Sequence, residues 1–433
     1  MKFRAAVVDR VTILNVEVEC EANGKTVWGF GSMPLGNVWS FPSARLSFDQ
    51  TLSAMRQLSS NLRILIGSSG AEGHPIDINH QLEPQYFETA AAIPLDEPIP
   101  PLCTLVVASA FDAAIHDAYG KAFGISCYET YGPEYMAHDL ATYLDLQFEN
   151  EYPEDYISQR AAASLSLYHL VGALDPLTAD DLLRPIGDGL PETLEDWVRA
   201  ERLNHIKVKL DGNDLAWDVN RIISVHQVLS SLPSQGQYRY SLDFNERCQA
   251  ADYVLECLAK VRENSLEAFD RIQYLEQPTH RNLNAPGTPD MHQAAAVKPV
   301  VIDESLVDYQ SLLRARELGY SGVALKACKG QSNALLMAAA AKKFGMFLCM
   351  QDLTCPGASF LHSASLAAHI PPLIAVEGNS RQYVPAANKP WESQFPKFFH
   401  VAAGRLDMSE LHGPGLGIVP IHVNSLQEHF QEH

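Results

Sequence analysis

The length and charge of the chain already exclude several classes of protein. With 433 residues it is too long for one simple domain and suits a barrel of about 250 residues plus an accessory domain. Lys and Arg number 32 against 52 Asp and Glu, and this net charge of −20 argues against nucleic acid and anionic membranes as partners, because both are bound mainly through Lys and Arg.

The first 132 residues are predicted to form an α+β domain outside any barrel. From Val7 to about Gly31 apolar and polar residues alternate around an Asn23-Gly24 turn, which predicts a β-hairpin. Helical periodicity follows in residues 44–65 and 108–124. Between them, this hairpin and these helices would make a capping domain.

The loop from Gly31 to Trp39 is a candidate for substrate contact. It is punctuated by Gly and Pro, follows a predicted strand, and carries Met33 and Trp39, which could line an apolar wall. An ordinary surface loop explains the same residues nearly as well.

The rest of the chain divides into an insertion, a barrel and a tail. Residues 133–165 match neither the helix nor the strand period, so we interpret them as an insertion or linker. Residues 166–399 alternate short apolar runs with helical segments, which predicts a parallel sheet closed as a barrel. Residues 400–433 contain Gly413-Pro-Gly-Leu-Gly417 and are expected to return to the first domain. The barrel strands are expected to end near Gly172, Lys209, Asp243, Glu276, Asp303, Lys326, Met350 and Glu377.

Charged residues stand at several of these strand ends. Asp243, Glu276 and Asp303 are 33 and 27 residues apart, about one βα unit each. Because strand C-termini converge at one mouth of a barrel, the three carboxylates could share one cation. An all-carboxylate set suits Mg²⁺, with Mn²⁺ as a possible substitute.

Lysines flank these acids on both sides of the sequence. Lys207 and Lys209 are two residues apart on a strand and so point to the same side. Repulsion between the two ammonium groups at about 4 Å is worth about 4 kcal/mol at an effective dielectric of 20, which would lower the pKa of one lysine by about three units. We therefore expect one lysine to be neutral near pH 7 and to act as a base, with Lys326 as the second.

This pattern resembles the enolase superfamily, of the kind that includes muconate lactonizing enzymes and mandelate racemase. The resemblance covers nearly the whole chain and implies an α/β fold, with a modified (β/α)7β TIM-like barrel and an N-terminal capping domain that the C-terminal tail completes. By this resemblance Asp243, Glu276 and Asp303 match the metal ligands, Lys209 the strand-two base, Lys207 its pKa-lowering neighbour, and Lys326 the strand-six lysine of the muconate-lactonizing subgroup.

The two-lysine subgroup is favoured by a missing residue. The mandelate racemase type would show a histidine at the seventh strand end, where this chain has Leu348-Cys-Met-Gln-Asp352. His362 and His369 follow on the next predicted helix, and we interpret them as ordinary helix histidines. Asn245, Asp352, Glu377 and Trp39 are the candidate substrate contacts.

The resemblance implies abstraction of a proton beside a carboxylate, through an enediolate intermediate. Return of a proton on the opposite face would give a racemase or epimerase of a carboxylic acid such as an N-acyl amino acid or dipeptide, which we prefer. Loss of a β-substituent or ring opening would instead give a lyase or cycloisomerase. A Mg²⁺-dependent hydrolase and a barrel that only binds acids remain alternatives from other classes.

The expected setting is cytoplasmic, with a small carboxylate as substrate and a homo-oligomeric enzyme. None of the eight cysteines forms a Cys-x-x-Cys pair, as is usual in a reducing compartment. The chain opens Met-Lys-Phe-Arg with no apolar export segment, and no run approaches 18 apolar residues. We therefore expect no membrane span.

Overall fold

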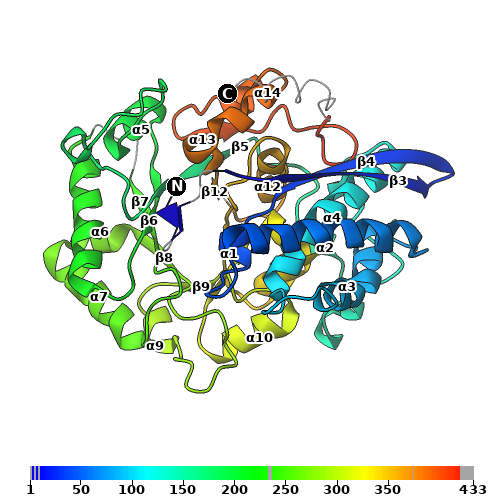
Figure 1. Cartoon of the computed structure of the whole chain (residues 1–433), viewed down its shortest axis with the longest axis horizontal. Helices are drawn as coiled ribbons and strands as arrows, with labels where there is room; N and C mark the ends of the chain where they lie inside the picture. The colour runs from blue at the N-terminus through cyan, green and yellow to red at the C-terminus, as the bar shows by residue number, and fades with distance from the viewer. Residues whose placement is uncertain (1, 4–5, 8–9, 233–236, 374, 420–433) are drawn as a thin grey trace.

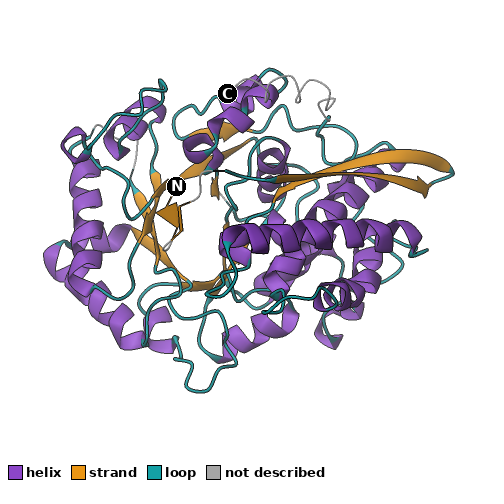
Figure 2. Ribbon diagram, in the orientation of Figure 1, coloured by secondary structure: helices purple, strands orange, loops and turns teal. Residues whose placement is uncertain are grey.

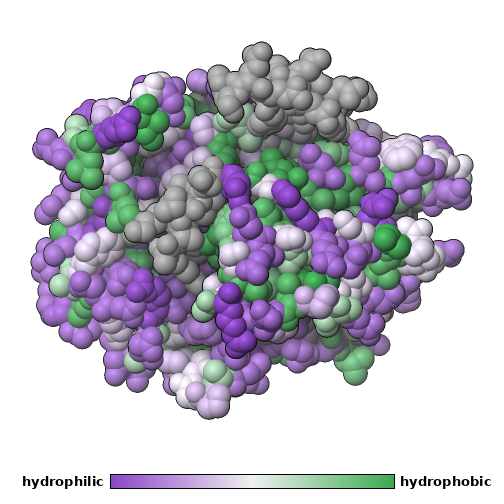
Figure 3. Space-filling view, viewed as in Figure 1, coloured by the Kyte–Doolittle hydropathy of each residue, from purple (hydrophilic) through white to green (hydrophobic). Residues whose placement is uncertain are grey.

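The computed structural model describes residues 2–3, 6–7, 10–232, 237–373 and 375–419 (Figure 1). Within them, a barrel and a helical domain lie side by side, and the helices α2, α3 and α4 of the latter gather on the right in Figure 1. Residues 420–433 of the predicted C-terminal segment lie outside the described residues. Figure 3 shows hydrophilic residues over most of one face, as the net charge of −20 leads one to expect.

Eight parallel strands form the barrel, as predicted. Neighbouring strands pair in chain order, and the eighth pairs with the first, which closes the ring (Figure 2). The strands are β5 (Ser164–Val171), β6 (His205–Lys209), β7 (Arg239–Asp243), β8 (Ile272–Glu276), β9 (Val300–Ile302), β10 (Gly322–Leu325), β11 (Phe347–Met350) and β12 (Ala375–Glu377). Their ends agree with the predicted ones.

Helices cover the outside of this ring. They are α5 (Leu194–Glu201), α6 (Leu215–Ser230), α7 (Ala251–Asn264), α8 (Leu266–Arg271), α9 (His292–Ala295), α10 (Tyr309–Glu317), α11 (Gln331–Lys343) and α12 (Ala358–Ala368), followed by the short α13 (Ser380–Tyr383), α14 (Lys389–Glu392) and α15 (Pro396–Phe399). Along β6 the apolar Ile206 and Val208 are fully buried and alternate with Lys207 and Lys209. Because successive side chains of a strand point to opposite faces, packing the apolar pair on the helices turns both lysines into the barrel.

The N-terminal domain is built on an antiparallel hairpin and three long helices. The strands β3 (Ile13–Ala22) and β4 (Lys25–Pro34) meet at Asn23 and Gly24, whose positive φ values of 51° and 68° suit a tight hairpin turn. The short strands β1 (Lys2–Phe3) and β2 (Ala6–Val7) pair separately, so the hairpin begins later than Val7. The helices of the N-terminal domain are α1 (Asn37–Ser40), α2 (Phe48–Ser68), α3 (Pro75–Ala91) and α4 (Pro101–Phe123).

Two helices of this domain differ from the sequence prediction. Helix α2 begins at Phe48 rather than at residue 44, because Ser47 and Gln50 form a reciprocal capping box there. Helix α4 begins at Pro101 rather than at residue 108, and by length and mean composition alone it would be able to cross a membrane, although Asp112, Asp117 and Lys121 interrupt its apolar residues. However, 94% of its most apolar window is buried, so it packs as a core helix, with Gly29 and Gly31 of β4 against it.

The segment before the barrel and the tail after it both run between the barrel and the N-terminal domain. Residues 133–163 contain the 3-10 turns η2 (Leu140–Thr142), η3 (Leu146–Phe148) and η4 (Pro153–Asp155). The tail first adds β13 (Arg405–Asp407) antiparallel to β5. It then reaches the helical domain, where Gly415 exchanges backbone hydrogen bonds with Ile125 and Cys127.

Candidate active site

The six charged residues singled out by the sequence all lie at the same end of the barrel. Lys209, Asp243 and Glu276 close their strands, Lys207 lies two residues before the end of β6, and Asp303 and Lys326 directly follow β9 and β10. In a ring of eight strands β6 and β10 are four positions apart, so their lysines approach from opposite sides. The three acids come from the strands between them.

Lys207 is surrounded by carboxylates. Its Nζ lies 2.8 Å from Glu276 Oε1, 2.8 Å from Glu377 Oε1 and 3.3 Å from Asp243 Oδ2. Burial alone would lower the pKa of Lys207, but these charges outweigh it and raise that pKa well above its usual value. Lys207 is therefore an ammonium group, so it is not the neutral amine expected of this lysine pair, because three acids outweigh one neighbouring amine.

Lys209 shares Asp243 with Lys207. Its Nζ forms a close ion pair with Asp243 Oδ2 and lies 3.2 Å from Asn245 Oδ1. The backbone N–H of Asn245 donates to Asp243 Oδ1 at 2.8 Å. Burial opposes ionisation of Asp243, but Lys209 and Lys207 hold its pKa well below the usual range.

On the opposite side, two lysines hold Asp303. Lys326 Nζ lies 2.7 Å from Asp303 Oδ2, and Lys329 Nζ lies 3.2 Å from Oδ1 and donates to the backbone oxygen at 2.5 Å. The pKa of Asp303 is lowered by these charges despite its burial. Lys329 was not among the residues predicted from the sequence, although the Lys326-x-x-Lys329 spacing, which brings the second amine back toward the first, could have indicated it.

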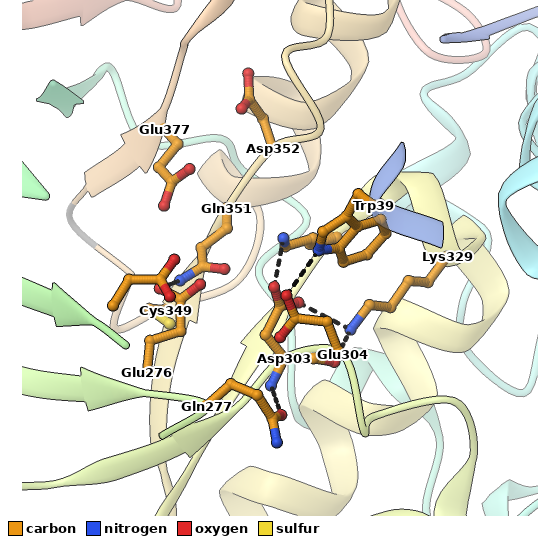
Figure 4. Close-up of polar contacts among 12 residues, drawn as sticks. Trp39, Glu276, Gln277, Asp303, Glu304, Lys329, Cys349, Gln351, Asp352 and Glu377 are labelled. Atoms are coloured by element: carbon orange, nitrogen blue, oxygen red, sulfur yellow. Dashed lines mark hydrogen bonds and ion pairs between the residues drawn. The ribbon is translucent and has the colours of Figure 1, made fainter. Parts of the chain in front are cut away.

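Trp39 of α1 reaches this side of the site from the N-terminal domain (Figure 4). Its ring centroid lies 4.3 Å from Lys326 Nζ, and its Nε1 donates to Glu304 Oε1 at 2.9 Å. Arg281 donates to the Trp39 backbone oxygen at 3.1 Å and pairs with both oxygens of Glu246 at 2.7 Å. Burial and then the charge of Glu246 raise the pKa of Glu304 to about 7.

The far wall consists of buried polar groups that are bonded to one another. Asp352 accepts four hydrogen bonds, from the backbone N–H groups of Thr354, Cys355 and Asn379 and from Asn379 Nδ2. Asn379 Nδ2 also lies 3.1 Å from Glu377 Oε2. Burial and then the charge of Glu377 raise the pKa of Asp352 to about 6.

These groups enclose a cavity of about 220 Å³. Asn245, Asp352, Glu377 and Trp39, the candidate substrate contacts, all line it. Its remaining wall is largely apolar and comes from both domains, with Leu35, Val38, Leu170, Leu174, Leu353 and Val384. Met33 does not line the cavity as suggested, because it is fully buried, with its sulfur 3.7 Å from that of Cys355.

The two helix histidines lie outside this cavity, in agreement with their interpretation. His362 Nε2 is 2.7 Å from Gln331 Oε1, and the ring of His369 stacks on Tyr128 at 3.8 Å between centroids. Burial lowers the pKa of each to about 4, so both are neutral at neutral pH.

The sequence of the chain matches the model of one known protein family. The model of a family described as enolase C-terminal domain-like matches residues 189–422, which is more than half of the chain. The chain belongs to the enolase superfamily. The match covers most of the barrel, and the resemblance inferred from the strand-end charges is thereby confirmed.

Solved structures share the architecture of this enolase-superfamily protein. They include muconate cycloisomerase from Pseudomonas fluorescens, with 17% identity over 98% of this chain and 99% of that one and a TM-score of 0.60. Muconate lactonizing enzyme from Pseudomonas putida has 16% identity over 96% and 94%, with a TM-score of 0.60. An isomerase from Streptomyces coelicolor A3(2) has 17% identity over 96% and 97%, with a TM-score of 0.58. At these identities the likeness shows the fold, and no curated protein sequence matches the chain.

Superfamily membership implies a divalent cation, and the donor atoms can be tested against it. Asp243, Glu276 and Asp303 offer only carboxylate oxygens, the hard ligands that suit Mg²⁺ and also Mn²⁺. Buried Asp303 Oδ1 accepts no hydrogen bond in the described structure, and its one close cation is the Lys329 ammonium group at 3.2 Å. Among the described residues no three His, Cys, Asp or Glu side chains are placed to hold an ion as they stand, and Lys207 and Lys326 pair with Glu276 and Asp303. The donor chemistry fits, and Mg²⁺ would compete with the ammonium groups for the oxygens.

Proposed function

We propose that this enzyme abstracts the proton α to a substrate carboxylate in a Mg²⁺-dependent reaction, and that it racemises or epimerises a carboxylic acid such as an N-acyl amino acid or a dipeptide. The single observation that supports this best is the placement of Lys209 and Lys326 on strands at opposite sides of the barrel, with three carboxylates on the strands between them. A substrate lying between the two amines would present one face to each.

In this proposal the two lysines exchange the roles of acid and base. One amine, in its neutral form, removes the α-proton and becomes an ammonium group. The substrate passes through an enediolate, and the ammonium group of the other lysine protonates the opposite face. Asp243, Glu276 and Asp303 would hold Mg²⁺, whose charge would offset that gained by the substrate carboxylate.

Several other groups would orient the reacting ones. Lys207 bridges Glu276, Glu377 and Asp243 and so fixes two of the proposed ligands. Gln351 Nε2 donates to Glu276 Oε2 in a short contact. Asn245 lies beside Lys209, and its side-chain amide donates to the Leu210 backbone oxygen at 2.8 Å, which fixes the orientation of its Oδ1 toward the amine.

Elimination of a β-substituent and ring opening by a cycloisomerase also begin with removal of the α-proton, so they remain the second candidates. Muconate cycloisomerases among the structural neighbours favour cycloisomerisation by analogy of fold. Racemisation is preferred because both sides of the site carry a lysine, whereas an elimination needs only one base beside the α-carbon. The eight free cysteines support a cytoplasmic location, and we expect a homo-oligomer.

Solvent deuterium incorporation tests the proposal. Pools of N-acyl amino acids, dipeptides and other carboxylic acids are incubated with the enzyme in ²H₂O, with Mg²⁺ or with a chelator, and examined by mass spectrometry and NMR. We expect exchange at an α-carbon only with the metal. Metal-dependent release of phosphate from phosphate esters, without exchange in any pool, would contradict the proposal in favour of a hydrolase, and Mg²⁺ binding with neither reaction would favour a binding barrel.

A further inference from the structure

The substituents of a bound substrate have one side of the barrel mouth left to them. Under the proposed function the substrate carboxylate lies toward the acids of β7, β8 and β9, and the two lysines of β6 and β10 flank its α-carbon. The rest of the ring consists of β11, β12 and β5, which pair in that order. Groups attached to the α-carbon would therefore extend over the loops that follow these three strands.

On that side the cavity has an apolar wall without a cation. The apolar side chains that line it are Leu170, Leu174, Leu353 and Val384. Among the described residues, the same loops contribute no Lys, Arg or His to the cavity. Arg10 reaches it from the N-terminal domain, with a side chain that is 57% exposed and paired with Asp49. Because exposed pairs of this kind contribute little, a second carboxylate on the substrate would gain little from Arg10.

The acids at the base of this wall already have partners (Figure 4). The two oxygens of Asp352 accept four hydrogen bonds, which fills the sites that a carboxylate offers. Glu377 pairs with Lys207 at 2.8 Å and accepts from Asn379 at 3.1 Å. An ammonium group on the substrate would have to compete with these donors, and a second carboxylate would be repelled by both acids.

Leu174 is the most exposed of the four apolar side chains, and its turn is firmly held. Its side chain is 69% exposed, whereas the other three are buried or half-buried. The Asp175 N–H closes the turn by donating to the Gly172 oxygen at 3.1 Å. The Asp175 carboxylate accepts from the Gly172 N–H at 2.8 Å and from Tyr383 Oη at 2.7 Å. Arg221 donates to the backbone oxygens of Gly172 and Asp175 at 2.6 and 2.8 Å. These bonds hold an apolar side chain at the cavity with most of its surface uncovered.

We propose that Leu174 is a specificity-determining residue and that the substrate carries an apolar, uncharged group that covers it. Burying apolar surface is favourable roughly in proportion to its area, and Leu174 has the largest exposed fraction of the four. The wall therefore favours N-acyl derivatives of apolar amino acids over dicarboxylic acids and over acids with a free ammonium group. The orientation of the substrate rests on the proposed function, whereas the preference for an apolar acid can be measured without any reaction.

Racemic amino acid derivatives test this preference in the wild-type enzyme. N-acetyl-leucine, N-acetylasparagine and N-acetylaspartate have side chains of nearly equal size, N-acetylglycine has none, and leucine itself carries a free ammonium group. Racemates are used because racemisation leaves their composition unchanged. Dissociation constants are measured by NMR titration in the presence of Mg²⁺. We expect N-acetyl-leucine to bind at least about tenfold more tightly than each of the other four.

Substitutions then assign the preference to Leu174. Leu174→Ala should weaken the binding of N-acetyl-leucine about three- to tenfold and leave that of N-acetylglycine unchanged, because only the former reaches the shortened side chain. Leu174→Lys places a cation in the wall and should make N-acetylaspartate bind about as tightly as N-acetyl-leucine. Leu183→Ala is the matched control, because Leu183 is a fully exposed leucine of the same loop that does not line the cavity. It should change none of these values.

The outcomes separate this inference from the proposed function. Equal binding of N-acetyl-leucine and any other probe, absence of binding included, or no effect of Leu174→Ala overturns the specificity. Exchange of the α-proton of the same probes is followed in parallel in ²H₂O. Preferential binding of N-acetyl-leucine without exchange supports the specificity and contradicts the proposed function for this acid. Exchange in all probes alike supports the proposed function and overturns the specificity.

Discussion

Replacing Lys207 with Met should make the stability of this enzyme depend on Mg²⁺. Methionine is close in size to lysine but removes the ammonium group that lies within 3.3 Å of Asp243, Glu276 and Glu377. All three carboxylates are almost completely buried. Removing one partner of a buried ion pair costs about 3–5 kcal/mol, because the remaining charge is left uncompensated.

This cost can be converted into a melting temperature. Unfolding entropy is about 2.1 cal/mol/K per residue, or about 0.9 kcal/mol/K for 433 residues, so a loss of about 4 kcal/mol lowers Tm by about 4–5 °C. We expect this decrease in the presence of a chelator. Mg²⁺ bound by Asp243 and Glu276 would supply the missing positive charge, so millimolar Mg²⁺ should restore most of the loss.

The assay is reversible thermal unfolding followed by circular dichroism, with chelator and with Mg²⁺. Lys260→Met is the matched control, because Lys260 pairs with Glu256 at the surface, where such a pair contributes at most about 1 kcal/mol. A Tm for Lys207→Met equal to that of the wild type in chelator would refute the electrostatic argument. A decrease that Mg²⁺ leaves unchanged would refute the assignment of these acids as ligands.

Two further predictions concern packing and pH. Gly29→Ala should destabilise the protein by at least about 3 kcal/mol in urea unfolding, because the added Cβ would lie 1.9 Å from the Ala114 backbone oxygen. Gly67→Ala in α2, where the added Cβ would meet no atom within 4 Å, should instead stabilise the protein by about 0.5–1 kcal/mol. Equal effects of the two substitutions would contradict the close packing of β4 on α4. Burial lowers the pKa of His205, His362 and His369 to about 4 in the folded protein, below the value of about 6.5 in the unfolded chain. Above about pH 6.5 these histidines therefore leave the stability unchanged, and as the pH decreases from about 6.5 toward 4 the stability falls, because only the unfolded chain takes up the protons. Each histidine should cost about 2 kcal/mol between about pH 7.5 and about pH 5, and His362→Gln should remove that share of the pH dependence, with His280→Gln at an exposed position as control; an unchanged pH dependence would contradict the prediction.

The sequence predicted the barrel well because its strand ends carry unusual residues. Lys-Val-Lys at the end of β6 and the acids at the ends of β7 and β8 mark both the strand and its C-terminus. Alternation along β6 also fixed which side chains enter the barrel. These are local signals, and a pattern of period two is sufficient to detect them.

What the sequence could not give depends on contacts between distant residues. The lysine pair suggested mutual repulsion, but the acids that raise the pKa of Lys207 come from β7, β8 and β12, and only the closed ring brings them together. Met33 and Trp39 looked equivalent in the loop, yet one packs in the core and the other covers Lys326. Lys329 joins the site only because a 3-10 turn brings its amine back to Asp303.

The central claim, that Lys209 and Lys326 act on opposite faces of one α-carbon, is tested most directly by face-specific deuterium exchange. Each enantiomer of a substrate from the pooled screen is incubated in ²H₂O with Mg²⁺ and with Lys209→Ala or Lys326→Ala, and exchange is followed by NMR. We predict that neither variant interconverts the enantiomers and that each still exchanges one enantiomer only, a different one in each case. Exchange of the same enantiomer by both variants, or interconversion by either, would contradict the account.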